Sequence, residues 1–202
     1  MGRFFSAQVV VVCLSVSLWI FGCAGRSSPV DFYTLTPMDQ PQQGKTSQGG
    51  MAIAIGPVTI PAALDRSQIV TRDGTNKIHL AENHRWAGPL QEDIAAVLAD
   101  NISGLLKSER VAPFTREDLF EPTHRIIVDI TRFDGQLDKE IILDVVWSIK
   151  KTTDSKPLVM RRSFVRETVT SPIYDDFVAA QSKALATLSA EMAEALKKIS
   201  NP

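Results

Sequence analysis

Few residues in this chain of 202 residues could carry chemistry. It contains two cysteines, Cys13 and Cys23, and three histidines, His79, His84 and His124. Cys23 ends the apolar stretch "LWIFGC", where its thiol could be a buried side chain, half of a disulfide or a site of covalent modification. No cysteine or close acidic cluster stands beside the histidines to complete a zinc-type ligand set. We therefore expect no metal site and no cofactor.

Several function classes find little support in the sequence. It has no G-x-S-x-G elbow, no Walker loop and no G-x-G-x-x-G fingerprint. A Ser/His/Asp assembly could still form around His84 or His124 from residues distant in the chain, which leaves a periplasmic hydrolase as a minor hypothesis. The 22 basic and 23 acidic residues are scattered without long runs, which argues against nucleic acid as a partner. We expect a protein that is not an enzyme.

The first 22 residues have the layout of a secretory signal peptide. Arg3 precedes an apolar run over residues 9–22, and a mostly polar sequence follows. Counted from Phe4, the run just reaches membrane-spanning length, so an uncleaved anchor is the alternative. Cleavage before Cys23 would remove Cys13 and leave one cysteine at the new N-terminus. That excludes a disulfide within the mature chain.

The sequence "IFGC" resembles the bacterial lipobox, in which the cysteine receives diacylglycerol and becomes the first residue. Ile20 and Gly22 match its aliphatic and small positions. We therefore predict a lipoprotein signal peptide at residues 1–22, lipidation at Cys23 with a short tether over 23–31, and a single periplasmic domain at 32–202. At roughly 3.5 Å per residue, the tether spans about 25–30 Å, so the domain should lie close to the membrane.

The remaining sequence predicts strands and two helices. Strands are expected at "FYTLTP", at residues 51–61 with a bend at Gly56-Pro57, and as a hairpin around Asp73-Gly74. A loop is expected at residues 39–50, a helix at 89–107 and a short strand at "RVAPF". Longer strands follow at 124–133, 140–151 and 158–170. The chain ends in a helix whose apolar stripe contains Phe177, Leu185, Leu188, Met192, Leu196 and Ile199.

This order of elements indicates an α+β fold. We expect a two-layer sandwich, with a mainly antiparallel β-sheet and two amphipathic helices packed on one of its faces.

The hairpin and its exit toward the first helix hold the candidate interface residues. These are Asp65, Arg66, Arg72, Arg85 and Trp86. In one interpretation they are structural, with Asp65 and Arg66 pairing locally and Trp86 packing back onto the helix. In the other they form an interaction edge, since tryptophan and arginine commonly anchor interfaces. The two interpretations are compatible.

A resemblance to a known family rests on four segments in order. The lipobox, "FYTL", "LDRSQIVTR" and "HRWAGPLQEDIAAVLADNI" together resemble the PqiC-type lipoproteins, also called ABC-type transport auxiliary lipoproteins. The matching positions are Leu64, Asp65, Arg66, Gln68, Ile69, Val70, Arg72, Arg85, Trp86, Ala87 and Pro89.

The resemblance implies a non-enzymatic role. Members of this family are periplasm-facing outer-membrane lipoproteins of Gram-negative bacteria. They work with mammalian-cell-entry (MCE) proteins or ABC permeases that move lipids between the two membranes, and PqiC-type proteins form rings. The expected partners are therefore an MCE-domain protein or ABC permease components, the membrane through the acyl chains, and further copies of this chain. An outer-membrane scaffold without lipid traffic is the alternative.

Overall fold

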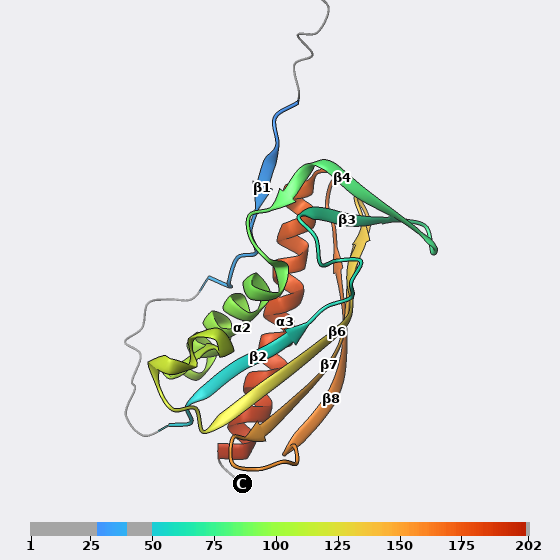
Figure 1. Ribbon diagram of the computed structural model, residues 1–202. Helices are drawn as coiled ribbons and strands as arrows, with labels where there is room; N and C mark the ends of the chain where they lie inside the picture. The colour runs from blue at the N-terminus through green and yellow to red at the C-terminus, as the bar shows by residue number, and fades with distance from the viewer. Residues whose placement is uncertain (1–27, 40–49, 201–202) are drawn as a thin grey trace, which may run out of the picture.

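The computed structural model describes residues 28–39 and 50–200. The predicted signal peptide and Cys23 lie outside the described residues, as do residues 40–49 of the loop expected at 39–50. The described chain forms two β-sheets and two long helices (Figure 1), which confirms the predicted α+β fold.

The larger sheet has five strands in the order β5-β2-β6-β7-β8. The strands are β5 (Val111–Pro113), β2 (Ile53–Thr59), β6 (His124–Gln136), β7 (Glu140–Lys151) and β8 (Val159–Thr168). As predicted, β6, β7 and β8 pair antiparallel, but β2 pairs parallel with both β5 and β6. The helix α2 (Leu90–Leu106) separates β2 from β5 in the chain, and such a crossover brings a chain back in the same direction.

The predicted hairpin belongs to a separate three-stranded sheet in the order β1-β4-β3. Its strands β3 (Gln68–Asp73) and β4 (Lys77–Trp86) pair antiparallel around the expected turn. The short strand β1 (Asp31–Tyr33) pairs parallel with the end of β4. The sequence did not predict this division, because hydrophobic alternation marks each strand and not its neighbour.

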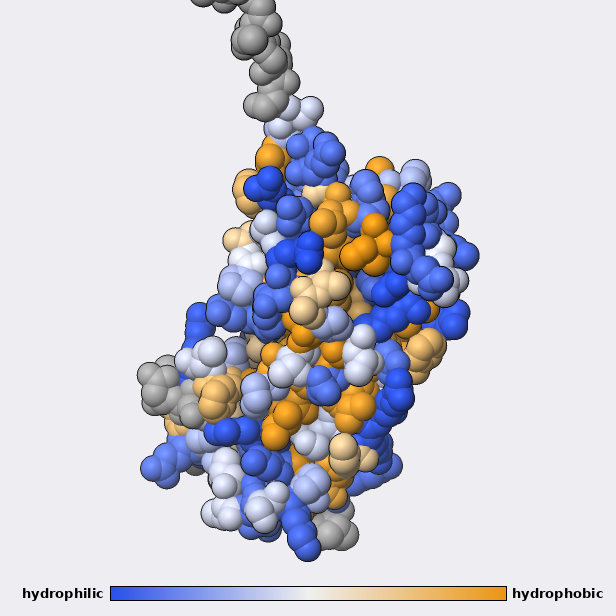
Figure 2. Space-filling model, turned by 45° about the vertical axis from the view of Figure 1, so that its right-hand side comes forward, coloured by the Kyte–Doolittle hydropathy of each residue, from blue (hydrophilic) through white to orange (hydrophobic). Residues whose placement is uncertain are grey.

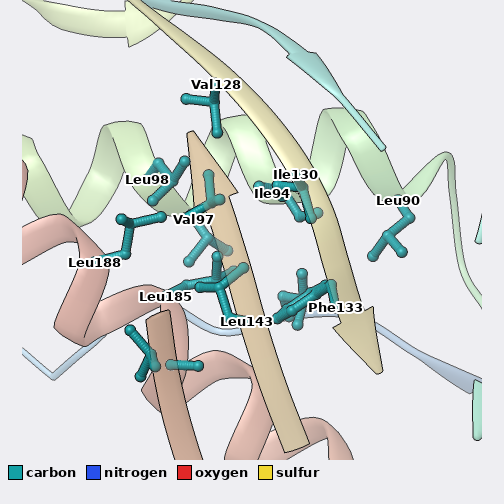
Figure 3. Packing of buried hydrophobic residues seen from close by; sticks show 14 of the residues in the cluster. Leu90, Ile94, Val97, Leu98, Val128, Ile130, Phe133, Leu143, Leu185 and Leu188 are labelled. Carbon is teal, nitrogen blue, oxygen red and sulfur yellow. The ribbon is translucent and has the colours of Figure 1, made fainter. Parts of the chain in front are cut away.

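Helices α2 and α3 (Tyr174–Ser200) cover one face of the five-stranded sheet, as predicted (Figure 1). Figure 3 shows Leu185 of α3 close to Leu143 of β7, and Leu188 of α3 close to Leu98 of α2. Each fully buried side chain of this kind contributes about 1.5–3 kcal/mol to stability. The predicted inward row of β7 is buried throughout; it comprises Ile141, Leu143, Val145, Trp147 and Ile149.

The opposite face of the same sheet is open and carries charged side chains together with the exposed apolar residues Met160 and Phe164. Asp144 lies between the buried Leu143 and Val145, so strand alternation points it to the open face. Arg162 of β8 donates from Nε and Nη2 to the two carboxylate oxygens of Asp144, at 2.8 and 2.6 Å. These hydrogen bonds lower the pKa of Asp144. The continuous apolar row of β7 therefore lies only on the face that the helices cover.

Two glycines are required by local geometry. Gly56 has a φ of 124°, and the β2–β6 register shifts between Ile55 and Val58, which confirms the predicted bend. At Gly135, a Cβ atom would lie 2.0 Å from the carbonyl oxygen of Glu140. The close approach of β6 and β7 near their turn therefore depends on a glycine.

The segment after β1 is held to both helices by their side chains. Asp93 of α2 accepts a hydrogen bond of 2.7 Å from the backbone N–H of Leu35 and one of 3.0 Å from the hydroxyl of Thr34. Ser182 of α3 accepts from the N–H of Thr36 at 3.1 Å. Asn101 of α2 accepts from Met38 at 2.8 Å. The N-terminal segment is thus joined to the helical layer by polar contacts that sequence periodicity does not reveal.

We predict that Asp93→Ala lowers the free energy of unfolding by about 1–3 kcal/mol, because it removes charge-assisted hydrogen bonds to the N-terminal segment. Urea denaturation followed by circular dichroism measures the change. Glu92→Ala is the matched control, since Glu92 is also an acidic residue in the first turn of α2 but is exposed. Equal losses in the two variants would mean that Asp93 acts only through the helix dipole.

Candidate functional site

The three sequence segments that carry the family resemblance meet in the three-stranded sheet. Arg85 of β4 has two backbone neighbours, Phe32 of β1 and Gln68 of β3. Tyr33 of "FYTL" is the register partner of Trp86, and the Trp86 N–H donates to the carbonyl of Ser67 at 2.7 Å. Residues more than 30 positions apart therefore form one small surface at one end of the molecule (Figure 1).

Arg72 connects the small sheet to the large one. Its Nε donates to Oδ1 of Asp134 on β6 at 2.7 Å, and Nε of Arg132 donates to the same oxygen at 2.8 Å. The Asp134 side chain is only 5% exposed, so two arginines compensate a buried carboxylate. The hydrogen bond to Asp134 raises the pKa of Arg72, although burial acts against it. Arg72 thus has a structural role within the chain.

Trp86 is a core residue. It is 5% exposed and belongs to the main hydrophobic cluster, together with Leu90 at the start of α2. This position agrees with the structural interpretation, in which Trp86 packs beside the helix that follows it.

Asp65, Arg66 and Arg85 are the candidate interface residues that reach the surface. Asp65 and Arg66 are exposed in the turn between β2 and β3, where the N–H of Arg66 donates to the carbonyl of Leu64 at 2.9 Å. Arg85 is half-buried, and its Nε has no hydrogen-bond partner among the described residues. Arg66 is therefore the exposed arginine of this set, whereas Arg85 is only partly exposed and its Nε is enclosed.

An aromatic cluster beneath this surface was not found from the sequence. The ring of His84 stacks on Tyr174 with centroids 4.0 Å apart, and the Tyr33 hydroxyl lies 2.9 Å from Nδ1 of His84. Burial raises the pKa of both tyrosines. Only the tertiary structure brings Tyr33 to Tyr174, since they lie near opposite ends of the sequence. The cluster fixes β1 and β4 to the start of α3.

The three histidines occupy three different environments. His79 is exposed on the hairpin, and His84 belongs to the aromatic cluster. His124 is buried at the start of β6, where burial and the nearby charge of Lys151 lower its pKa. Residues 28–39 and 50–200 contain no group of three His, Cys, Asp or Glu side chains arranged to hold a metal ion.

A hollow of 170 Å³ lies between β2, α2 and the 3-10 helix η1 (Phe114–Leu119). It is lined by residues including Gly56, Gln91 and Phe114. This volume is below the roughly 300 Å³ at which small-molecule sites begin, and far too small for a whole phospholipid. None of the candidate interface residues lines it.

Comparison with known proteins identifies the family. Residues 33–193 match the model of the family described as "ABC-type transport auxiliary lipoprotein component". The chain belongs to this family.

No described helix has the length and apolar character needed to cross a membrane.

Two curated relatives match most of the chain. The chain is 26% identical over 184 residues to "Intermembrane transport lipoprotein PqiC" of Escherichia coli (strain K12), covering 91% of this chain and 95% of that protein. The protein of the same name from Shigella flexneri matches with the same identity and coverage.

Solved structures support the same fold. An uncharacterized protein aligns with a TM-score of 0.69 at 20% identity, covering 84% of this chain and 99% of its own. Protein XCC0632 from Xanthomonas campestris aligns with a TM-score of 0.66 at 17% identity, covering 81% and 93%. At these identities the similarity establishes the fold and nothing more.

We predict that Arg72→Ala lowers the free energy of unfolding by about 1–3 kcal/mol, because Asp134 loses one of its two arginine partners while remaining buried. Arg66→Ala, an exposed arginine from the same family segment, should change stability by less than about 0.5 kcal/mol. Urea denaturation of the two variants checks both values. Equal stability of the variants would contradict the structural role of Arg72.

Proposed function

We propose that this protein is a lipid-anchored accessory subunit of an MCE/ABC-type lipid transport system that connects the inner and outer membranes and supports envelope integrity. Membership of the auxiliary lipoprotein family and similarity to PqiC over nearly the whole chain support this role. In this role the protein acts by binding and positioning other components, not by catalysis.

The observation that carries the proposal is the convergence of the family segments beside the N-terminal entry strand. Arg85, Gln68 and Phe32 are backbone neighbours in the small sheet, and β1 begins eight residues after Cys23. A lipidated Cys23 would hold this sheet within about 25–30 Å of a membrane. Several buried acyl chains give stable anchoring. The surface formed by these segments would therefore be held close to the bilayer.

We place the anchor in the outer membrane, with the domain facing the periplasm of a Gram-negative bacterium. Ala24 follows Cys23, and it is not the aspartate that typically marks retention in the inner membrane of enterobacteria. The partners in this proposal are an MCE-domain protein, ABC permease components or both.

We further propose that copies of the chain assemble into a ring. A closed ring needs two different, complementary patches on each protomer. The hairpin supplies a candidate for one patch, because it projects from the body (Figure 1) and exposes Ile78 and Leu80. Asp65, Arg66 and Arg85 are candidates for contacts at its base, where they reach the surface.

For the anchor, Cys23→Ala should abolish incorporation of a labelled fatty acid, because the modified thiol is removed. Cys13→Ala is the matched control and should retain the label, since Cys13 lies inside the signal peptide in this proposal. Acyl labelling followed by membrane flotation measures both. Continued labelling of Cys23→Ala would refute the lipobox assignment.

For the transport role, a photoreactive residue at Arg66 should crosslink to an MCE protein, an ABC component or a second copy of this chain. The control position is Lys198, exposed near the far end of α3, which should give no such product. Mass spectrometry of the crosslinked products identifies the partners. In a separate experiment, deletion of the gene should increase the sensitivity of the cells to detergent. Crosslinks only to outer-membrane assembly proteins, with an unchanged envelope, would favour the scaffold alternative.

A further inference from the structure

The first described strand exposes large apolar side chains at the end of the domain from which the tether leaves. Phe32 in the middle of β1 is 66% exposed, and Val30 just before it is also exposed. Figure 2 shows hydrophobic residues at the surface of this end, close to where the chain enters the domain. Apolar side chains that are exposed together on a surface often mark an interaction site.

The position of Phe32 follows from strand alternation. Its neighbour Tyr33 points inward to His84 and Tyr174, so Phe32 points away from the domain. Its register partner on β4 is Arg85, and Arg66 is exposed in the turn that leads to β3. An aromatic ring beside arginines has the chemistry of the boundary between lipid headgroups and acyl chains.

The short stretch of sequence between Cys23 and Val30 indicates that the bilayer covers this patch. Val30 is seven residues from Cys23, so a lipid-anchored chain holds it within about 25 Å of the membrane. In a lipid-anchored chain, so short a tether gives this side chain a high effective concentration at the bilayer surface, and a soluble partner has no such advantage.

We propose that Phe32 and Val30 insert into the headgroup region of the phospholipid bilayer, with Arg85, the register partner of Phe32, close to lipid phosphates. The contact orients the domain, which a flexible acyl anchor alone does not do. Helix α3, about 40 Å long, starts at this end and carries the opposite end of the five-stranded sheet away from the membrane (Figure 1). This inference rests on the proposed lipidation of Cys23.

A matched control exists at the opposite end of the molecule. Met160, near the start of β8, is 69% exposed, almost as much as Phe32. Ser163 of the same strand donates a hydrogen bond to Glu191 in the C-terminal half of α3, whereas β1 lies beside the start of α3, so Met160 lies far from β1. If contact with the bilayer orients the domain, the side chain at position 32 should lie among lipids and the side chain at position 160 should remain in water.

The test uses the full-length lipoprotein in vesicles of phosphatidylethanolamine and phosphatidylglycerol, with or without brominated acyl chains. Tryptophan is introduced as Phe32→Trp, with Val30→Trp as a second reporter and Met160→Trp as the control. We expect brominated lipid to reduce the added emission about twofold at positions 32 and 30 and to leave position 160 unchanged. Cleavage before Cys23 removes Trp19, so the processed protein without an added tryptophan supplies the background from Trp86 and Trp147, which are both buried.

Two outcomes would overturn the proposal while leaving the anchor intact. One is vesicle-bound, acylated protein in which brominated lipid does not quench position 32 or 30. The other is tryptophan emission at these positions whose intensity changes with the protein-to-lipid ratio but not with bromination of the lipid. That result would mean that a second copy of the chain covers the patch. Protein that lacks acyl label and does not float with the vesicles would refute both the anchor and the bilayer contact.

Discussion

The structure depends on the burial of one face of the five-stranded sheet beneath α2 and α3. Alternate residues of β7, from Ile141 to Ile149, point into this interface, while Asp144 points to the open face. Because strand side chains alternate, a shift of one residue in register would expose the whole apolar row. This constraint fixes the register of the sheet and gives the helices one surface on which to pack.

The three-stranded sheet is held to this core by polar contacts and by a few aromatic side chains. Arg72 reaches the buried carboxylate of Asp134, and His84 stacks on Tyr174 at the start of α3. Asp93 fixes the segment after β1 to α2. The point where the tether enters is therefore coupled rigidly to the core. An anchored protein needs such coupling if a membrane contact is to determine the orientation of the whole domain.

The candidate site could be predicted from the sequence only in part. The position of Asp65, Arg66, Arg72, Arg85 and Trp86 on and around one hairpin followed from its turn signal and strand pattern. Which of them face solvent did not follow, because that depends on elements distant in the chain. Asp134 takes Arg72, and the core takes Trp86. The cluster of Tyr33, His84 and Tyr174 had no sequence signal, since no local periodicity relates residues so far apart.

By itself, the sequence determined the two helices, the hairpin, the inward row of β7 and the bend at Gly56, because each arises from local spacing or from the backbone freedom of one residue. The tertiary structure alone decided that β2 pairs parallel with β5 and β6, that the strands divide into two sheets, and that β1 joins β4. Strand neighbours are chosen by hydrogen bonds between distant segments and by which arrangement buries the apolar faces together. No single stretch of sequence contains that information.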